Sequence, residues 1–289
     1  MLTASASPAD FPARLSVVRR LLLERCGSDE KGRRAAALVQ RIENRLQRPP
    51  RIVLLGETNS GKSTLANRLL QRELLTTDIV RNTRAPVLVR HAPVAAVHIA
   101  TRDGARRSLT VDTASQTRLD EIERVEVDVP LAALQDFELL DLPGLATDDG
   151  AIARARRECA TAHMAIWVTV ASQAWKASEL GLWRSLSKRF GSACVLAVTH
   201  GDGLSRTDRT KVMTRLERDA APLFRCVVMV GEEGGTASAG AGAGAGVPEH
   251  NARNILAVVR ATAGEIQAQR CKRAAAVVRR YSERMVGAT

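Results

Sequence analysis

The spacing of apolar residues predicts two amphipathic helices at the beginning of the chain. Apolar side chains recur three and four residues apart between residues 11 and 25, at Phe11, Leu15, Val18 and Leu22. After a break at Gly27 and Ser28 the spacing returns, at Ala35, Leu38, Val39, Ile42 and Leu46. Such spacing is typical of a helix that buries one face. The Pro49-Pro50 pair ends the second helix, because proline cannot continue it.

Short continuous apolar runs follow, and they have the length of buried strands. The first, residues 52–55, leads into a glycine-rich loop and then a helix from about Ser63 to Gln71. Further strand candidates lie at residues 137–140, 164–170, 194–199 and 226–230. Helical stretches near residues 149–162, 176–190 and 206–220 separate the later runs. This alternation predicts an α/β fold with a mostly parallel sheet and helices on both faces.

Residues 86–140 are richer in strand signals than the rest of the chain. Apolar and polar residues alternate at residues 87–89, 97–99 and 125–129, and Asp103-Gly104 marks a turn. This alternation is typical of half-exposed strands.

The last part of the chain combines a flexible segment with a long basic helix. Residues 234–247 are small and of low complexity, which is typical of a linker. Beyond them a helix is predicted over about 249–286, with an apolar stripe at Ile255, Val259, Ile266, Val277, Tyr281 and Met285. The predicted organisation is N-terminal helices at 1–50, an α/β domain at 51–232, a Gly/Ala linker at 233–247 and a basic amphipathic helix at 248–289.

Composition and charge narrow the function classes. The chain has 289 residues and a formal charge of +12. That charge favours an anionic partner, either a membrane surface or nucleic acid, although arginines spread over solvated helix faces explain it equally well. The five cysteines and five histidines are scattered, which argues against a zinc site. No apolar run is long enough to span a bilayer, so we expect a cytoplasmic protein, soluble or peripheral at the inner face of the membrane.

The glycine-rich loop carries the clearest chemistry. Residues 56–63 read Gly56, Glu57, Thr58, Asn59, Ser60, Gly61, Lys62 and Ser63, and Thr64 follows. This is the Walker A pattern between a strand and a helix, in which backbone N–H groups point at phosphate oxygens. Lys62 then supplies charge at the β- and γ-phosphates, and the Ser63 hydroxyl ligates Mg²⁺. The fold predicted is therefore that of a P-loop NTPase.

Two further motifs follow later strands. Asp141-Leu142-Pro143-Gly144 places a carboxylate where it can hold Mg²⁺ through water, while the Gly144 amide faces the γ-phosphate. Thr199-His200-Gly201-Asp202 places a second carboxylate where it can accept hydrogen bonds from both N–H groups of guanine. Taken alone, each motif is also compatible with an ordinary turn. Together they predict a guanine nucleotide site with Asp202 as the base-reading residue.

With these motifs in order, residues 51–232 resemble the GTPase domain of the dynamin superfamily, especially bacterial dynamin-like proteins. The resemblance rests on residues 61–70, 73–77, 83–86 and 141–144. It implies that Thr83 closes over the nucleotide and ligates Mg²⁺ through its hydroxyl. It also implies that helices from both ends of the chain pack as a bundle that transmits the nucleotide state.

Departures from the family pattern affect hydrolysis and assembly. Leu145 stands where Ras-like proteins carry a water-orienting glutamine, so hydrolysis needs another device. Asn59 stands where many dynamins have serine; potassium-dependent GTPases place asparagine there to help bind K⁺. Arg81 and Arg84 flank Thr83 and are alternative sources of positive charge. The long stalk and membrane-binding insert of dynamins proper have no counterpart, so membrane-wrapping collars are not expected.

The predicted function is a dynamin-like GTPase that binds GTP or GDP with Mg²⁺ and hydrolyses GTP, with Lys62, Thr83 and Asn59 as catalytic residues. Its nucleotide cycle would move the terminal helices and control association with a second copy, another protein or an anionic membrane. Assembly would use the GTPase face or the terminal helices. Two alternatives remain open: a regulatory GTPase acting on RNA or ribosomes, and a nucleotide-binding interaction protein with little turnover.

Overall fold

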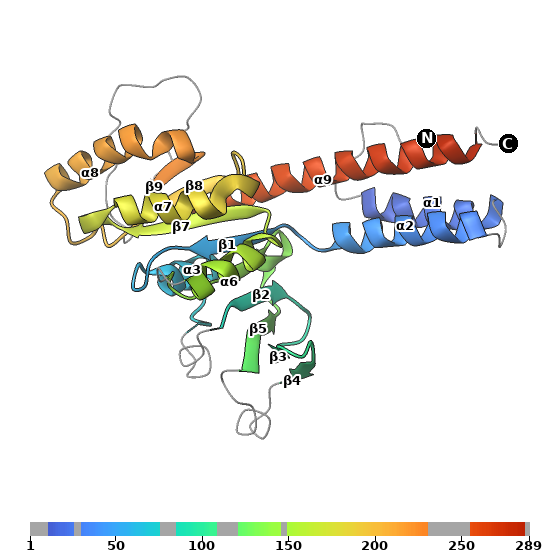
Figure 1. Cartoon of the computed structure of the whole chain (residues 1–289), viewed down its shortest axis with the longest axis horizontal. Coiled ribbons are helices and arrows are strands. Elements are labelled where there is room, and N and C mark those ends of the chain that lie inside the picture. Colours follow the sequence, from blue (N-terminus) through green and yellow to red (C-terminus); the bar gives the residue numbers. More distant parts are fainter. Residues whose placement is uncertain are drawn as a thin grey trace. The chain divides into compact units, whose positions relative to one another are not determined.

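The computed structural model describes residues 11–25, 30–75, 85–108, 121–145, 149–230 and 255–286 (Figure 1). The chain divides into two compact units, which are described separately. The first comprises residues 1–50 and 263–289, and the second comprises residues 51–262. Thr83, Arg81, Arg84 and the predicted linker at 233–247 lie outside the described residues.

Among the described residues, three helices build the first unit. Helix α1 (Phe11–Arg25) and helix α2 (Glu30–Gln47) lie side by side (Figure 1). The third is helix α9 (Ile255–Val286), which enters this unit from residue 263 onward. One hydrophobic cluster joins all three, and its buried members are Phe11, Leu15, Val39, Leu46, Cys271, Ala274 and Val278.

Polar contacts fasten α9 to the end of α2. The Gln267 amide donates to the Leu46 carbonyl oxygen at 2.9 Å, and Arg270 donates to the carbonyl oxygens of Arg45 and Arg48. These carbonyls lie at the carboxyl end of a helix, where backbone oxygens have no partner within the helix. Arginine therefore satisfies acceptors that the Pro49-Pro50 break leaves open.

The beginning of α9 belongs to the second unit. Ile255 and Val259 are buried there. The sequence predicted that the helices from the two ends of the chain pack together, with Ile255 and Val259 buried. The α9 residues that share a cluster with α1 are Cys271, Ala274 and Val278, which lie roughly three to six helical turns further along.

A nine-stranded sheet forms the centre of the second unit, in the order β4-β3-β5-β2-β6-β1-β7-β8-β9. Strand β1 (Arg51–Leu55) lies between β6 (Glu138–Asp141) and β7 (Met164–Val170), and β8 (Cys194–Thr199) and β9 (Cys226–Met229) follow β7. All four pairings in this half are parallel. Residues 52–55 of β1 are fully buried on both faces of the sheet, which explains their continuous apolar run.

The strand-rich segment extends the same sheet. It supplies β2 (Val87–His91), β3 (Ala96–Thr101), β4 (Arg106–Ser108) and β5 (Ile122–Val129). Strand β2 is antiparallel to β6 and parallel to β5, and β3 is antiparallel to both β4 and β5. Five of the eight pairings among the described strands are therefore parallel. The predicted fold class, a mostly parallel sheet with helices, is confirmed.

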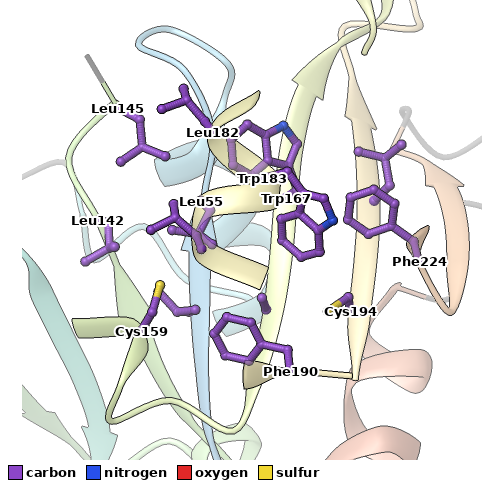
Figure 2. Close-up of a cluster of buried hydrophobic side chains, with 14 of the residues drawn as sticks. Leu55, Leu142, Leu145, Cys159, Trp167, Leu182, Trp183, Phe190, Cys194 and Phe224 are labelled. Carbon is purple, nitrogen blue, oxygen red and sulfur yellow. The ribbon is translucent and has the colours of Figure 1, made fainter. Parts of the chain in front are cut away.

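Helices α6 (Asp149–Cys159), α7 (Ala177–Leu186) and α8 (Arg206–Asp219) contribute to the core on one face of the sheet. Figure 2 shows this cluster, in which Trp167 of β7 meets Trp183 of α7 edge to face at 5.8 Å. Trp183 also stacks on Phe224, with ring centroids 4.5 Å apart. Although aromatic residues make up only 3% of the chain, four of them meet in this cluster: Trp167, Trp175, Trp183 and Phe224.

The parallel strands place four loops at one edge of the sheet. The carboxyl ends of β1, β6, β7 and β8 lead into the segments that begin at Gly56, Leu142, Ala171 and His200. In open α/β sheets, ligands bind at this edge. Among the helices that the structure describes, none combines the length and the apolar character needed to cross a bilayer.

Candidate nucleotide-binding site

Two glycines shape the loop between β1 and helix α3 (Lys62–Leu70). Gly56 has a φ of 148°, and a Cβ there would lie 2.3 Å from the backbone oxygen of Val168. Gly61 has a φ of 83° and forms the N-cap of α3. No other residue fits at Gly56 without moving the backbone of β7. The loop therefore curls back over the beginning of α3, as the Walker A pattern predicts.

Lys62 is buried inside this loop. Its Nζ donates to the carbonyl oxygen of Glu57 at 2.7 Å and to that of Gly56 at 3.2 Å. Burial lowers the pKa of Lys62, although the nearby charge of Asp141 opposes this effect. The ammonium group thus lies at the N-terminus of α3 with few neutralising charges around it. Phosphate oxygens would supply the missing negative charge.

Ser63 and Asp141 form a pair of oxygen ligands beside the lysine. The Ser63 hydroxyl donates to Asp141 Oδ2 at 2.8 Å. Burial raises the pKa of Asp141 to about 6, against the hydrogen bond from Ser63 and the charge of Lys62. Asp141 Oδ1 is buried and has no hydrogen-bond partner among the described residues. Mg²⁺ prefers hard oxygen ligands, so a buried carboxylate with an open oxygen next to a hydroxyl fits this ion.

The loop after β6 is in direct contact with the phosphate loop. The Leu145 amide donates to the Gly56 carbonyl oxygen at 3.0 Å, and Leu145 forms a parallel bridge with Glu57. A Cβ on Gly144 would lie 2.5 Å from both Cα and Oγ1 of Thr58. Glycine is thus required for the two loops to approach this closely.

Leu145 itself cannot orient a water molecule. Its side chain is buried in the hydrophobic cluster together with Leu55 and Leu142 (Figure 2). The residue that replaces the glutamine of Ras-like proteins therefore packs into the core.

The loop after β8 brings the third motif to the same edge. The Thr199 hydroxyl lies 2.7 Å from the carbonyl oxygen of Ser60 and 3.1 Å from that of Thr169, which ties this loop to the phosphate loop. His200 has a φ of 54°. Arg209 donates to the carbonyl oxygen of Gly201 at 2.6 Å and to that of Asp202 at 3.2 Å, while Asp202 is exposed at the edge.

The remaining loop residues differ in exposure. Thr58, Asn59 and Thr64 are exposed, and Asn59 has a φ of 61°, a conformation that asparagine tolerates better than most residues. Ser60 is buried, and its hydroxyl has no hydrogen-bond partner within the described part of the chain. A buried donor without a partner at a phosphate loop fits a ligand oxygen.

The segment after β7 also contacts the phosphate loop, and the sequence did not predict this contact. Lys176 Nζ lies 3.4 Å from Glu57 Oε2, and the Ser178 hydroxyl donates to Glu57 Oε1 at 2.9 Å. These residues are about 120 positions from Glu57, so no local pattern links them. The one available signal was Lys176-x-x-Glu179 at the beginning of a helix, since a glutamate at that spacing can bond the N-cap amide.

The site combines a strand, a glycine loop and a helix around a buried lysine. A Ser–Asp pair lies beside the lysine, at the carboxyl edge of a mostly parallel sheet. These features define a P-loop nucleotide-binding protein. The sequence model of the dynamin family matches residues 52–200, which is more than half of the chain. The chain therefore belongs to the dynamin family, and its second unit contains a GTPase domain of the dynamin type.

Curated relatives are bacterial. Dynamin-like protein 2 of Campylobacter jejuni is 25% identical over 167 residues, which cover 56% of this chain and 27% of that protein. The isoniazid-induced protein IniC of Mycobacterium tuberculosis is 33% identical over 113 residues, which cover 37% of this chain and 23% of IniC. The chain thus matches about a quarter of the length of these relatives.

Two solved structures have the same fold. They come from an oligomerised bacterial dynamin pair that provides a mechanism for long-range sensing and tethering of membranes. One has a TM-score of 0.58 at 17% identity, and the match covers 89% of this chain and 42% of the chain in that structure. The other has a TM-score of 0.56 at 14% identity, and the match covers 94% of this chain and 43% of the chain in that structure. At these identities the likeness concerns the fold.

Proposed function

We propose that this chain binds guanine nucleotide with Mg²⁺ at residues 56–63 and hydrolyses GTP. The observation that carries the proposal is the Ser63–Asp141 pair beside the buried Lys62. Both Asp141 Oδ1 and Ser60 Oγ are buried without partners among the described residues, which is the arrangement that a cation and phosphate oxygens would complete.

Each residue has a chemical role in this proposal. Lys62 binds phosphate oxygens, Ser63 and Asp141 hold Mg²⁺, and Gly144 offers its amide to the terminal phosphate. Thr83 is proposed as a further Mg²⁺ ligand on the basis of the family pattern. When bound, Mg²⁺ neutralises charge on the phosphates. Since Leu145 is buried, positive charge and water orientation have to come from elsewhere, and K⁺ held by Asn59 is our candidate.

Base selectivity is assigned to Asp202. A carboxylate accepts from both N–H groups of guanine, a pair that adenine lacks. Competition of unlabelled nucleotides against a fluorescent guanine nucleotide tests this, for the wild type and for Asp202→Asn. We expect the wild type to prefer GTP strongly over ATP, and the variant to shift preference toward xanthosine triphosphate, whose extra carbonyl accepts from the new amide. Equal wild-type affinity for ATP and GTP would remove this assignment.

The nucleotide cycle is proposed to act on the terminal helices and through them on association with a second copy, another protein or an anionic membrane. The formal charge of +12 supports an anionic surface. The fold shared with a membrane-tethering dynamin pair favours a membrane over RNA. Sedimentation with anionic liposomes at low and high salt, beside ribosome pelleting, distinguishes the two. Salt-sensitive binding to liposomes is expected; binding to ribosomes alone would favour the regulatory alternative.

A further inference from the structure

The segment between β7 and α7 holds a strained conformation next to the phosphate loop. It runs through a short 3-10 turn (Ala171–Gln173) to Trp175, which has a φ of 61°. This left-handed region is unfavourable for a large aromatic residue. Such a conformation persists only where the surrounding contacts determine it, and residues of this kind gather at functional sites.

The buried carboxylate of Glu179 holds this segment in place through hydrogen bonds. Glu179 is almost fully buried and accepts three hydrogen bonds, from Trp167 Nε1 at 2.9 Å, Thr169 Oγ1 at 3.0 Å and the Lys176 amide at 3.0 Å. The Trp175 amide donates to Thr169 Oγ1 at 3.3 Å. The Trp175 ring also meets Phe224 edge to face at 5.1 Å. Two of these contacts engage backbone amides of the segment itself, those of Trp175 and Lys176.

Two side chains of this segment, those of Lys176 and Ser178, contact the phosphate loop. Lys176 and Ser178 both contact the Glu57 carboxylate, and the Lys176 and Glu57 side chains are 43% and 30% exposed. An exposed ion pair of this kind contributes little to the stability of a fold. A contribution to the stability of the fold is therefore a weak explanation for this pair.

Glu57 is the residue through which this contact can matter. Its carbonyl oxygen accepts from Lys62 Nζ at 2.7 Å, and its backbone bridges to Leu145. Holding its side chain thus restrains the peptide that positions the phosphate-binding lysine and the loop after β6. A loop that is ordered before the ligand arrives loses less conformational entropy on binding.

We propose that Lys176 and Ser178 are positioning residues that act through Glu57 to hold the phosphate loop ready for nucleotide. The inference rests on the proposed function of the loop and adds two positioning residues to the same site. Lys176 acts on the loop and not on the nucleotide itself. Its loss therefore weakens binding and raises KM, and it leaves kcat for GTP hydrolysis unchanged.

A double-mutant cycle with Lys176→Ala and Glu57→Ala tests this, read out by the affinity for a fluorescent guanine nucleotide and by kcat and KM. We expect each single variant to bind about fivefold more weakly, and the double variant to bind no more weakly than either single one. Lys211→Ala is the matched control, because Lys211 pairs with Asp208 at 3.2 Å in another exposed ion pair. The Lys211→Ala variant should keep the wild-type affinity for nucleotide, and all variants should melt at the wild-type temperature.

Three results would overturn the inference: unchanged affinity in Lys176→Ala, additive losses in the double variant, or a fall in kcat with KM unchanged. Additive losses would mean that Lys176 acts independently of Glu57. If the wild type itself bound no guanine nucleotide, the proposed function of the site would fail instead. The two failures are therefore distinguishable in the same experiment.

Discussion

At the scale of single residues, the proposed phosphate site contains two buried charged groups whose burial the folded chain offsets only in part. Burial lowers the pKa of Lys62 and raises that of Asp141 to about 6, so the charged form of each is less stable in the fold than in water. Phosphate oxygens and a divalent cation are the partners that would offset both costs. Residues of this kind favour ligand binding over the stability of the nucleotide-free chain.

Asp141→Asn should therefore stabilise the metal-free protein. Above about pH 6 Asp141 is ionised in both folded and unfolded chains, and the fold bears the full cost of burying the charge. Between pH 3.8 and about 6 the folded chain keeps a proton that the unfolded chain releases, so stability falls as pH rises through this window. Neutral asparagine avoids the cost of burying a charge, and we expect the free energy of unfolding to rise by an amount on the order of 1–3 kcal/mol at pH 7.5.

Urea unfolding in EDTA measures this gain, which should shrink as pH falls from 6 toward 4. Addition of Mg²⁺ and nucleotide should reverse the ranking, because the variant lacks the carboxylate that we propose as an Mg²⁺ ligand. A variant less stable than the wild type at pH 7.5 would contradict the account of Asp141.

Asn59 is the residue on which monovalent-cation dependence would rest. Negative charge develops near the bridging oxygen of the leaving phosphate during hydrolysis, and no glutamine side chain is available at Leu145. GTP turnover is expected to be faster in K⁺ than in Na⁺ at matched ionic strength, and Asn59→Ala should lose the difference. Equal wild-type rates in both salts would remove K⁺ from the mechanism and leave Arg81 or Arg84 as the alternative source of charge.

At the scale of elements, long runs with one clear period were predictable and contacts between distant loops were not. The strands at residues 52–55, 164–170 and 194–199 were predicted because burial on both faces gives continuous apolar runs. The helices α1, α6, α7 and α8 begin and end within a few residues of the expected positions. The antiparallel pairing of β2 with β6 was not predictable, because strand order depends on the whole sheet.

The same limit applies to the site. The motifs at residues 56–63, 141–144 and 199–202 were predicted because their chemistry requires fixed spacings, and the structure brings all three to one edge. The contact of Glu57 with Lys176 and Ser178 was not predicted from the sequence, because it joins the phosphate loop to the beginning of α7, about 120 residues away.

The packing of α1 against α2 and α9 can be tested by shortening one buried side chain. Leu15 is fully buried in the three-helix cluster, whereas Leu21 on the same helix is 44% exposed. Leu15→Ala should lower the free energy of unfolding of the first unit by about 2–5 kcal/mol, and Leu21→Ala by less than about 0.5 kcal/mol. Urea unfolding followed by far-UV circular dichroism provides the comparison. Similar losses in both variants would contradict the burial of Leu15.

At the scale of the whole molecule, the chain combines a dynamin-type GTPase domain with a helical unit drawn from both ends of the sequence. The first unit takes residues 1–50 and 263–289, so the GTPase domain lies between its two parts in the sequence. Helix α9 begins in one unit and continues in the other. We propose that the nucleotide state acts on the terminal helices through this helix.

The measurement that tests the central claim most directly is release of inorganic phosphate from GTP, with Lys62→Ala as the variant. The wild type should bind GTP and release phosphate only when Mg²⁺ is present. Lys62→Ala should lose binding or turnover, because we propose that this buried ammonium group supplies the charge that holds the β- and γ-phosphates. The variant must first be shown to melt as the wild type does. Unchanged GTP affinity and turnover in a folded Lys62→Ala protein would contradict the assignment of the phosphate loop and with it the proposed function.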